Sequence, residues 1–121
     1  MPRVILVVDD SETIRKILST TLRLRGFHPV TASDGMEALE RIAEGGVDLI
    51  ITDLNMPVMD GYELTAAVRR TAPCRDVPII MLTTEAEEED RRRGLEAGVN
   101  AYLTKPAQPS VLLAHIEQLL N

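Results

Sequence analysis

Aromatic residues and cysteine are scarce in this sequence. It contains no Trp, two Tyr and one Phe, so it lacks the aromatic platforms on which single-stranded nucleic acids stack. Its single cysteine, Cys74, has no second cysteine in the chain with which to form a disulfide. These scarcities argue against a base-stacking domain and exclude an intramolecular disulfide.

The chain also lacks a basic tract and a long apolar segment. Its net charge is -6, and its only run of three basic residues is Arg91–Arg93, unlike the basic footprint of a nucleic-acid binder. The apolar run Val4–Val8 is too short for a signal peptide or a membrane span. We therefore expect a cytoplasmic protein that binds no nucleic acid and does not insert into a membrane.

Apolar runs alternate with segments of helical spacing along the 121 residues. A chain of this length buries roughly two thirds of its unfolded surface, so we expect one domain over residues 1–121. Runs bounded by turn residues predict strands at 4–8, 29–32, 48–53, 77–82 and 101–104. Helical spacing predicts helices at about 12–25, 36–44, 60–72, 86–97 and 111–120. This alternation is typical of an α/β domain whose parallel sheet is covered on both faces.

Polar residues lie at or just past the ends of four of the predicted strands: Asp9, Asp10, Asp53, Thr83 and Lys105. Because open parallel sheets bind ligands beyond the carboxyl ends of their strands, we expect these side chains to converge at one edge. Carboxylates placed close together raise one another's pKa unless a hard cation such as Mg²⁺ neutralises them. Lysine binds phosphate as a point charge, a threonine hydroxyl donates to phosphoryl oxygens, and a carboxylate can act as a nucleophile. The set predicts phosphoryl transfer, which depends mainly on positioning and charge stabilisation.

Each of these residues also has an ordinary structural interpretation. Asp9 and Asp10 could simply cap the following helix, and Asp53 could be a turn residue at a strand end. Thr83 alone is typical of a helix start, and Lys105 of a solvated turn. Their joint position at the ends of four strands is what these interpretations do not explain.

Four motifs carry a resemblance to a known family: Val7-Val8-Asp9-Asp10-Ser11, Asp53-Leu54-Asn55-Met56-Pro57-Val58-Met59-Asp60-Gly61, Met81-Leu82-Thr83 and Ala101-Tyr102-Leu103-Thr104-Lys105-Pro106. Over its whole length the sequence resembles the receiver domain of two-component response regulators of the CheY type. The resemblance implies a doubly wound, flavodoxin-like fold with a five-stranded parallel sheet in the order 2-1-3-4-5 and five helices.

The resemblance also implies a phosphorylation site with a metal. Asp53 would be the phosphoacceptor. Asp10, Asp53 and the backbone carbonyl of Asn55 would ligate Mg²⁺, or Mn²⁺ in its place, and Asp9 would act through water. The Lys105–Pro106 peptide bond would be cis, which proline permits at small cost.

The same resemblance assigns switching and tuning roles. Thr83 and Lys105 would contact the phosphoryl group, and Tyr102 would turn inward on activation as an aromatic switch. Asn55 and Glu85 stand at the two positions that tune the lifetime of the phosphorylated state in the family. Both are of the types found in the chemotaxis protein.

The implied partners are proteins. A sensor histidine kinase or phosphotransfer protein would supply the phosphoryl group, and a target would bind the face made by the fourth helix, fifth strand and fifth helix. We expect a stand-alone monomer in chemotaxis, motility or phosphorelay signalling, with no enzymatic activity beyond its own phosphorylation and dephosphorylation.

Some positions depart from the family pattern. Thr84 stands where a smaller residue is common, and Ala107 where Phe or Leu is frequent. The fourth helix is charged over Glu87–Arg93, so we expect a polar partner at the output face. Within that helix Gly94 costs about 1 kcal/mol relative to Ala.

Two rival functions remain open. A phosphatase of the haloacid dehalogenase type also uses a strand-end Asp with Mg²⁺, Thr and Lys, but it needs a second Asp two residues after the nucleophile. Here Asn55 follows Asp53, and Ser11 follows Asp9. A receiver-like module that binds its partner constitutively is the other rival, and binding without phosphorylation would support it.

Overall fold

The computed structural model describes residues 2–84 and 88–121. Within these ranges the strands are β1 (Val4–Val8), β2 (His28–Ala32), β3 (Leu49–Asp53), β4 (Ile79–Thr83) and β5 (Ala101–Thr104). All of the pairings are parallel, and the order is β2-β1-β3-β4-β5. The predicted fold class is therefore confirmed, and the strand order reverses between β1 and β3, where such sheets bind ligands.

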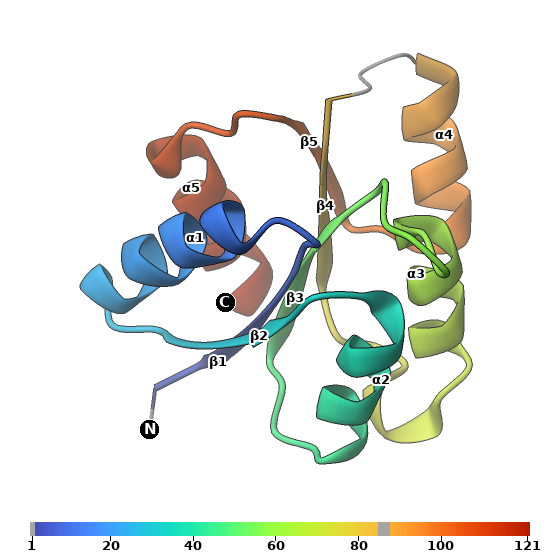
Figure 1. Ribbon diagram of the computed structural model, residues 1–121, viewed down its shortest axis with the longest axis horizontal. Coiled ribbons are helices and arrows are strands. Elements are labelled where there is room, and N and C mark those ends of the chain that lie inside the picture. The colour runs from blue at the N-terminus through green and yellow to red at the C-terminus, as the bar shows by residue number, and fades with distance from the viewer. Residues whose placement is uncertain (1, 85–87) are drawn as a thin grey trace.

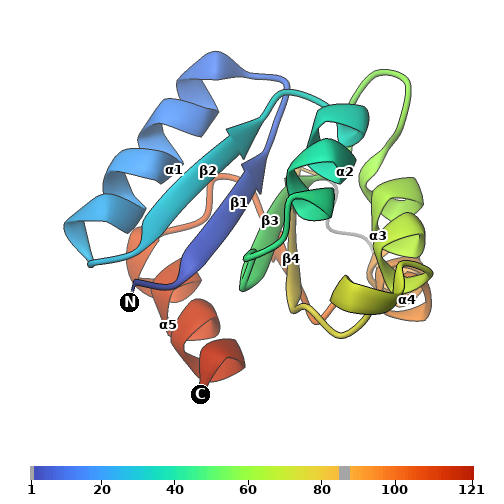
Figure 2. The same cartoon turned by 90° about the horizontal axis from the view of Figure 1, so that it is seen from below.

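Helices cover both faces of the sheet (Figures 1 and 2). They are α1 (Glu12–Leu24), α2 (Gly35–Ala43), α3 (Gly61–Arg69), α4 (Glu88–Ala97) and α5 (Pro109–Leu120), with a short 3₁₀ turn η1 (Ala72–Cys74). On one face α1 and α5 bury Leu22, Leu112 and Ile116. On the other, α2, α3 and α4 contribute Ala38, Leu64 and Ala97 to a second cluster. None of the helices in the described ranges is long and apolar enough to cross a membrane.

Side-chain caps start three helices close to the ends of strands. Ser11 accepts a hydrogen bond from the backbone of Ile14 at the start of α1. Asp34 caps α2 in the same way. A capping box between Asp60 and Glu63 starts α3, satisfying two backbone donors that the first turn leaves without partners.

Several boundaries differ from the sequence prediction, among them the end of α3, which lies at Arg69 and not at 72. Backbone chemistry explains three of the others. β4 begins at Ile79 and not at Val77, because the Val77 N–H bonds to Cys74 in a turn and Pro78 has no N–H to donate. β3 begins one residue later than predicted, since the Asp48 carboxylate accepts the N–H of Val4 at 2.7 Å. α5 begins at Pro109, whose fixed φ suits a first helical position. Residues 86–87 of the predicted fourth helix lie outside the described ranges.

Arg69, the last residue of α3, joins three segments near the amino ends of the strands, opposite the carboxylate-bearing ends. Its guanidinium donates to the carbonyls of Arg75 and Val77 at 2.9 and 2.6 Å. It also donates to the Gly98 carbonyl at 2.7 and 3.1 Å and to Asn100 Oδ1 at 2.8 Å. The chain segments that enter β4 and β5 are therefore held to the end of α3.

β2 forms one edge of the sheet. Its first residue, His28, donates its N–H to the carbonyl of Arg3 at 2.9 Å. Because successive N–H groups of a strand point to opposite sides, the nitrogen of Pro29 faces away from β1.

Candidate functional site

Three carboxylates meet where β1 and β3 end. Asp9 follows β1 directly, Asp10 is next in the chain, and Asp53 is the last residue of β3. One oxygen of each carboxylate lies within 4.8 Å of the others. Asp9 and Asp53 are buried, with 2% and 7% of their surfaces exposed, whereas Asp10 is exposed. The predicted convergence of these three residues is found in the structure.

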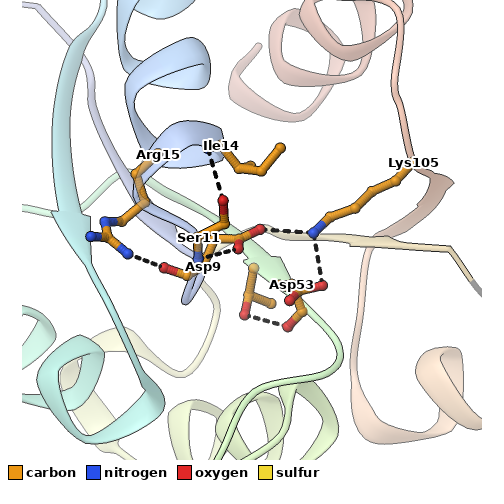
Figure 3. Close-up of polar contacts among 7 residues, drawn as sticks. Asp9, Ser11, Ile14, Arg15, Asp53 and Lys105 are labelled. Atoms are coloured by element: carbon orange, nitrogen blue, oxygen red, sulfur yellow. Dashed lines mark hydrogen bonds and ion pairs between the residues drawn. The ribbon is translucent and has the colours of Figure 1, made fainter.

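Lys105 bridges two of the carboxylates (Figure 3). Its Nζ lies 2.8 Å from Oδ2 of Asp9 and 3.0 Å from Oδ1 of Asp53. The lysine follows β5, so residues separated by most of the chain meet here. Its peptide bond to Pro106 is cis, as predicted.

Burial controls the protonation of this cluster. Desolvation raises the pKa of Asp53; the hydrogen bond from Lys105 opposes that rise, and the nearby charge of Asp9 adds to it. Burial by itself lowers the pKa of Lys105, but the hydrogen bonds to Asp9 and Asp53 and the negative charges of both carboxylates together outweigh burial and raise that pKa. One ammonium therefore does not fully compensate the carboxylates, and a further cation beside Asp53 would favour its ionised form.

The donor set fits a magnesium ion. Hard oxygen ligands, two of them buried and one exposed to solvent, suit a cation that binds one or two carboxylates and keeps several waters. Asn55 lies two residues beyond Asp53, in the loop between β3 and α3, and its side chain is exposed. No histidine or cysteine belongs to this described group, which agrees with a preference for Mg²⁺ or Mn²⁺ over softer metals.

Asp9 is held from three sides. Its Oδ1 accepts the N–H of Ser11 at 2.9 Å, and its own N–H donates to the carbonyl of Ala32 at 3.1 Å. Arg15 Nη1 donates to the Asp9 carbonyl at 2.6 Å (Figure 3). This arginine is not evident from the sequence, because nothing in its helical spacing shows that it reaches back to the strand end.

Gly61 determines how closely α3 approaches the phosphoacceptor candidate. A Cβ atom on Gly61 would lie 2.7 Å from the Asp53 carbonyl oxygen and 3.0 Å from Leu54 Cα. The Gly61 N–H donates to the Leu54 carbonyl at 2.8 Å, which closes the loop. At the tip of that loop Val58 has φ 71°, a left-handed conformation that a β-branched residue rarely adopts. The Asp60-Gly61 pair predicted a helix start, but not this steric requirement.

The ends of β4 and β5 complete the site. Thr83, the last residue of β4, is fully buried, and its carbonyl accepts the N–H of Lys105 at 2.7 Å. Thr84, next in the chain, is exposed. Glu85, the predicted tuning residue, lies outside the described ranges.

Both tyrosines of the chain pack against α4. Tyr102 of β5 is 6% exposed, and its ring would lie 3.0 Å from a Cβ on Gly94. Tyr62 of α3 donates its hydroxyl to the carbonyl of Asp90 at 3.0 Å and lies 4.5 Å below the Arg93 guanidinium. The glycine that weakens α4 as a helix thus leaves room for both rings, and Tyr102 lies inward in this structure.

Comparison with known proteins supports one family. The profile of the response regulator receiver domain matches residues 5–117. The phosphate regulon transcriptional regulatory protein PhoB of Klebsiella pneumoniae is 42% identical over 121 residues, which cover 100% of this chain and 53% of PhoB. The transcriptional regulatory protein PrrA of Mycobacterium tuberculosis is 44% identical over 120 residues, covering 99% of this chain and 50% of PrrA. The chain thus spans about half the length of these curated relatives.

Solved structures resemble the whole chain. Chemotaxis protein CheY4 of Vibrio cholerae superposes with a TM-score of 0.95 at 41% identity, covering 99% of this chain and 100% of CheY4. The receiver domain of sensor histidine kinase PA1611 from Pseudomonas aeruginosa has a TM-score of 0.91 at 32% identity, covering 99% and 98% of the two chains. That structure has a magnesium ion coordinated in its active-site cleft.

Proposed function

The chain belongs to the response regulator receiver domain family of two-component systems, and on that premise we propose that it is a switch controlled by phosphorylation of Asp53. The arrangement of Asp53 beside Asp9, Asp10 and Lys105 at the switch point of the sheet supports this assignment most directly. The proposal covers residues 1–121 as one receiver domain.

In the proposed reaction, an Asp53 carboxylate oxygen attacks the phosphorus of a phosphohistidine on a sensor kinase or phosphotransfer protein. The phosphorus–nitrogen bond breaks as the oxygen–phosphorus bond forms, and the histidine leaves with the bonding pair. Asp9, Asp10, Asp53 and the Asn55 carbonyl would hold Mg²⁺, or Mn²⁺, which neutralises charge on the transferred group when bound. Lys105 and Thr83 would donate to the phosphoryl oxygens. Hydrolysis of the acyl phosphate resets the switch, with Asn55 and Glu85 tuning its rate.

Phosphorylation changes what Lys105 can bind. The ammonium now shared between Asp9 and Asp53 would gain a phosphoryl dianion as its partner, and Thr83 would be drawn the same way. Tyr102 of β5 packs its ring against Gly94 of α4, so we propose that it transmits this shift to the face formed by α4, β5 and α5. This is a local charge event that biases a two-state surface.

The output of the switch is proposed to be protein binding by a monomer. The net charge of the 121 residues is -6, which makes direct contact with nucleic acid unfavourable. Relatives of two kinds match it: transcriptional regulators about twice its length and a chemotaxis protein of similar length. The α4-β5-α5 face serves either output, through a target protein or through a neighbouring domain, and no enzymatic activity beyond self-phosphorylation and dephosphorylation is proposed.

Intact mass spectrometry after incubation with acetyl phosphate tests the proposal. We expect one phosphoryl adduct that requires Mg²⁺, decays on standing and is absent from Asp53→Asn. Asp76→Asn is the matched control, because Asp76 is exposed and precedes β4 at the opposite edge of the sheet. Absence of the adduct in a folded protein that binds Mg²⁺ would favour a constitutive interaction module. Steady turnover of a phosphomonoester would instead favour the phosphatase alternative. That alternative needs a second Asp two residues after Asp53, where this chain has Asn55.

A further inference from the structure

A polar groove runs between α1 and the edge strand β2. Its volume is about 420 Å³. The lining includes Arg15, Lys16, Ser19 and Arg23 from the helix and Thr31 from β2. Figure 2 shows α1 lying alongside β2 at this edge of the sheet. We propose that this groove binds a small oxyanion that carries two anionic groups, of the pyrophosphate or polycarboxylate class.

The charge of the groove opposes that of the molecule. The chain has a net charge of -6, yet three cations line this cavity against one acid, Glu12. Glu12 is paired with Lys16 at 3.2 Å in an exposed contact. In the described part of the chain neither Arg15 nor Arg23 forms an ion pair, so two guanidinium groups remain for an anion. Guanidinium groups match carboxylate and phosphate oxygens in a bidentate geometry.

A buried hydroxyl at the groove lacks a partner. Ser19 is 6% exposed, and among the described residues its Oγ is the only buried side-chain oxygen or nitrogen without a hydrogen bond. Such groups carry a free-energy penalty, which an acceptor that reaches the hydroxyl, such as an anion or a water, would remove. Thr31 adds a second hydroxyl: its neighbours Val30 and Ala32 pack on the opposite face of the sheet, so by strand alternation Thr31 points toward α1.

Two guanidinium groups in one groove favour a ligand that carries more than one anionic group. Arg15 and Arg23 are eight residues apart, or about 12 Å along a helix axis. Arg15 already donates one N–H to the Asp9 carbonyl, which fixes that end of the groove and leaves its other N–H groups for a ligand. None of the described lining residues is aromatic, so the groove offers no platform for a nucleobase.

A titration of the full chain with sodium pyrophosphate tests the proposal. Binding is followed by ¹H–¹⁵N NMR at constant ionic strength without divalent metal. Saturable shifts are expected at Ser19, Thr31 and the neighbouring α1 amides. Citrate should reproduce them if the ligand is a polycarboxylate, and orthophosphate should bind more weakly than either probe. Arg23→Gln should weaken binding by about tenfold or more, as expected for a lost charge-assisted hydrogen bond. Arg25→Gln, an exposed change of the same charge just beyond α1, should leave affinity within about twofold.

Ser19→Ala tests whether the anion binds in a defined site or is only attracted by the positive charge of this surface. Without anion it should raise the unfolding midpoint, because the unpartnered hydroxyl is gone. It should also reduce the further rise that pyrophosphate produces. Equal effects of Arg23→Gln and Arg25→Gln would overturn the proposal, as would shifts confined to Thr83, Thr104 and Lys105. Binding of an acidic peptide without binding of pyrophosphate or citrate would also overturn it, in favour of a protein partner.

Discussion

Lys105 carries one positive charge that two buried carboxylates share. Replacing it with methionine would leave Asp9 and Asp53 facing each other without their counter-ion. Because removing one partner of a buried ion pair strands the other charge, Lys105→Met should lower the free energy of unfolding by about 3 kcal/mol at pH 7. Added Mg²⁺ should restore more stability to this variant than to the parent.

Urea denaturation with and without Mg²⁺ measures both effects. Lys16→Met is the control, since Lys16 forms only an exposed pair with Glu12, and a change within about 0.5 kcal/mol is expected there. Equal losses in the two variants would show that the Lys105 ammonium does not neutralise the carboxylates.

Asp53 should make stability depend on pH in a direction opposite to that of an acid whose partners lower its pKa. Burial raises its pKa, so the folded state holds this proton more tightly than the unfolded state. Its contribution to stability is therefore present at low pH and lost as pH rises from the ordinary aspartate range through the raised pKa. Asp53→Asn should stabilise the fold at pH 7, and this gain should vanish in acid. Unfolding midpoints of both proteins across pH 3–8 check the sign, and a gain that grows toward low pH would contradict it.

At the scale of elements, α3 can start beside Asp53 only because its first residue has no side chain. Gly61→Ala would place a methyl group 2.7 Å from the Asp53 carbonyl oxygen. Backbone must then shift, so we expect a loss of about 1–3 kcal/mol and slower phosphorylation by acetyl phosphate. Gly35→Ala, at the first position of α2, meets the side chain of Met59 in a loop and not strand backbone, and should cost less. Equal phosphorylation rates for Gly61→Ala and the parent would show that α3 does not position Asp53.

Elements with strong local patterns could be predicted from sequence, and contacts between elements could not. β1 and β5 match their predicted bounds, because each is an apolar run stopped by polar residues. The convergence of Asp9, Asp53 and Lys105 followed from one topological rule about parallel sheets. In contrast, the Arg15 bond to the Asp9 carbonyl and the clearance at Gly61 depend on how closely a helix approaches a strand end, which no local spacing records.

Across the whole molecule, the Arg69 hydrogen-bond network and the carboxylate cluster lie at opposite ends of the strands. Arg69 joins α3 to the segments entering β4 and β5, far along the strands from the carboxylates. Arg69→Gln should lower the unfolding free energy by about 2–3 kcal/mol, since several hydrogen bonds worth roughly 1 kcal/mol each are lost. Below the unfolding transition its rate of phosphorylation should stay close to that of the parent.

Arg70→Gln supplies the matched control, because Arg70 is the exposed next residue and the charge change is identical. Chemical denaturation and the acetyl phosphate reaction measure the two properties separately. A large fall in the phosphorylation rate of folded Arg69→Gln would show that the amino and carboxyl ends of the strands are coupled.

The outward-facing nitrogen of Pro29 affects how the protein behaves at high concentration. Edge strands can recruit strands from other copies and so begin aggregation. By alternation, the backbone nitrogens of residues 29 and 31 point away from β1, toward the outer side of β2, and residue 29 is a proline without an N–H. A second copy approaching this edge would find the N–H of Thr31 as the only outward backbone donor within the strand. One donor is too few to pair the edge strands of two copies.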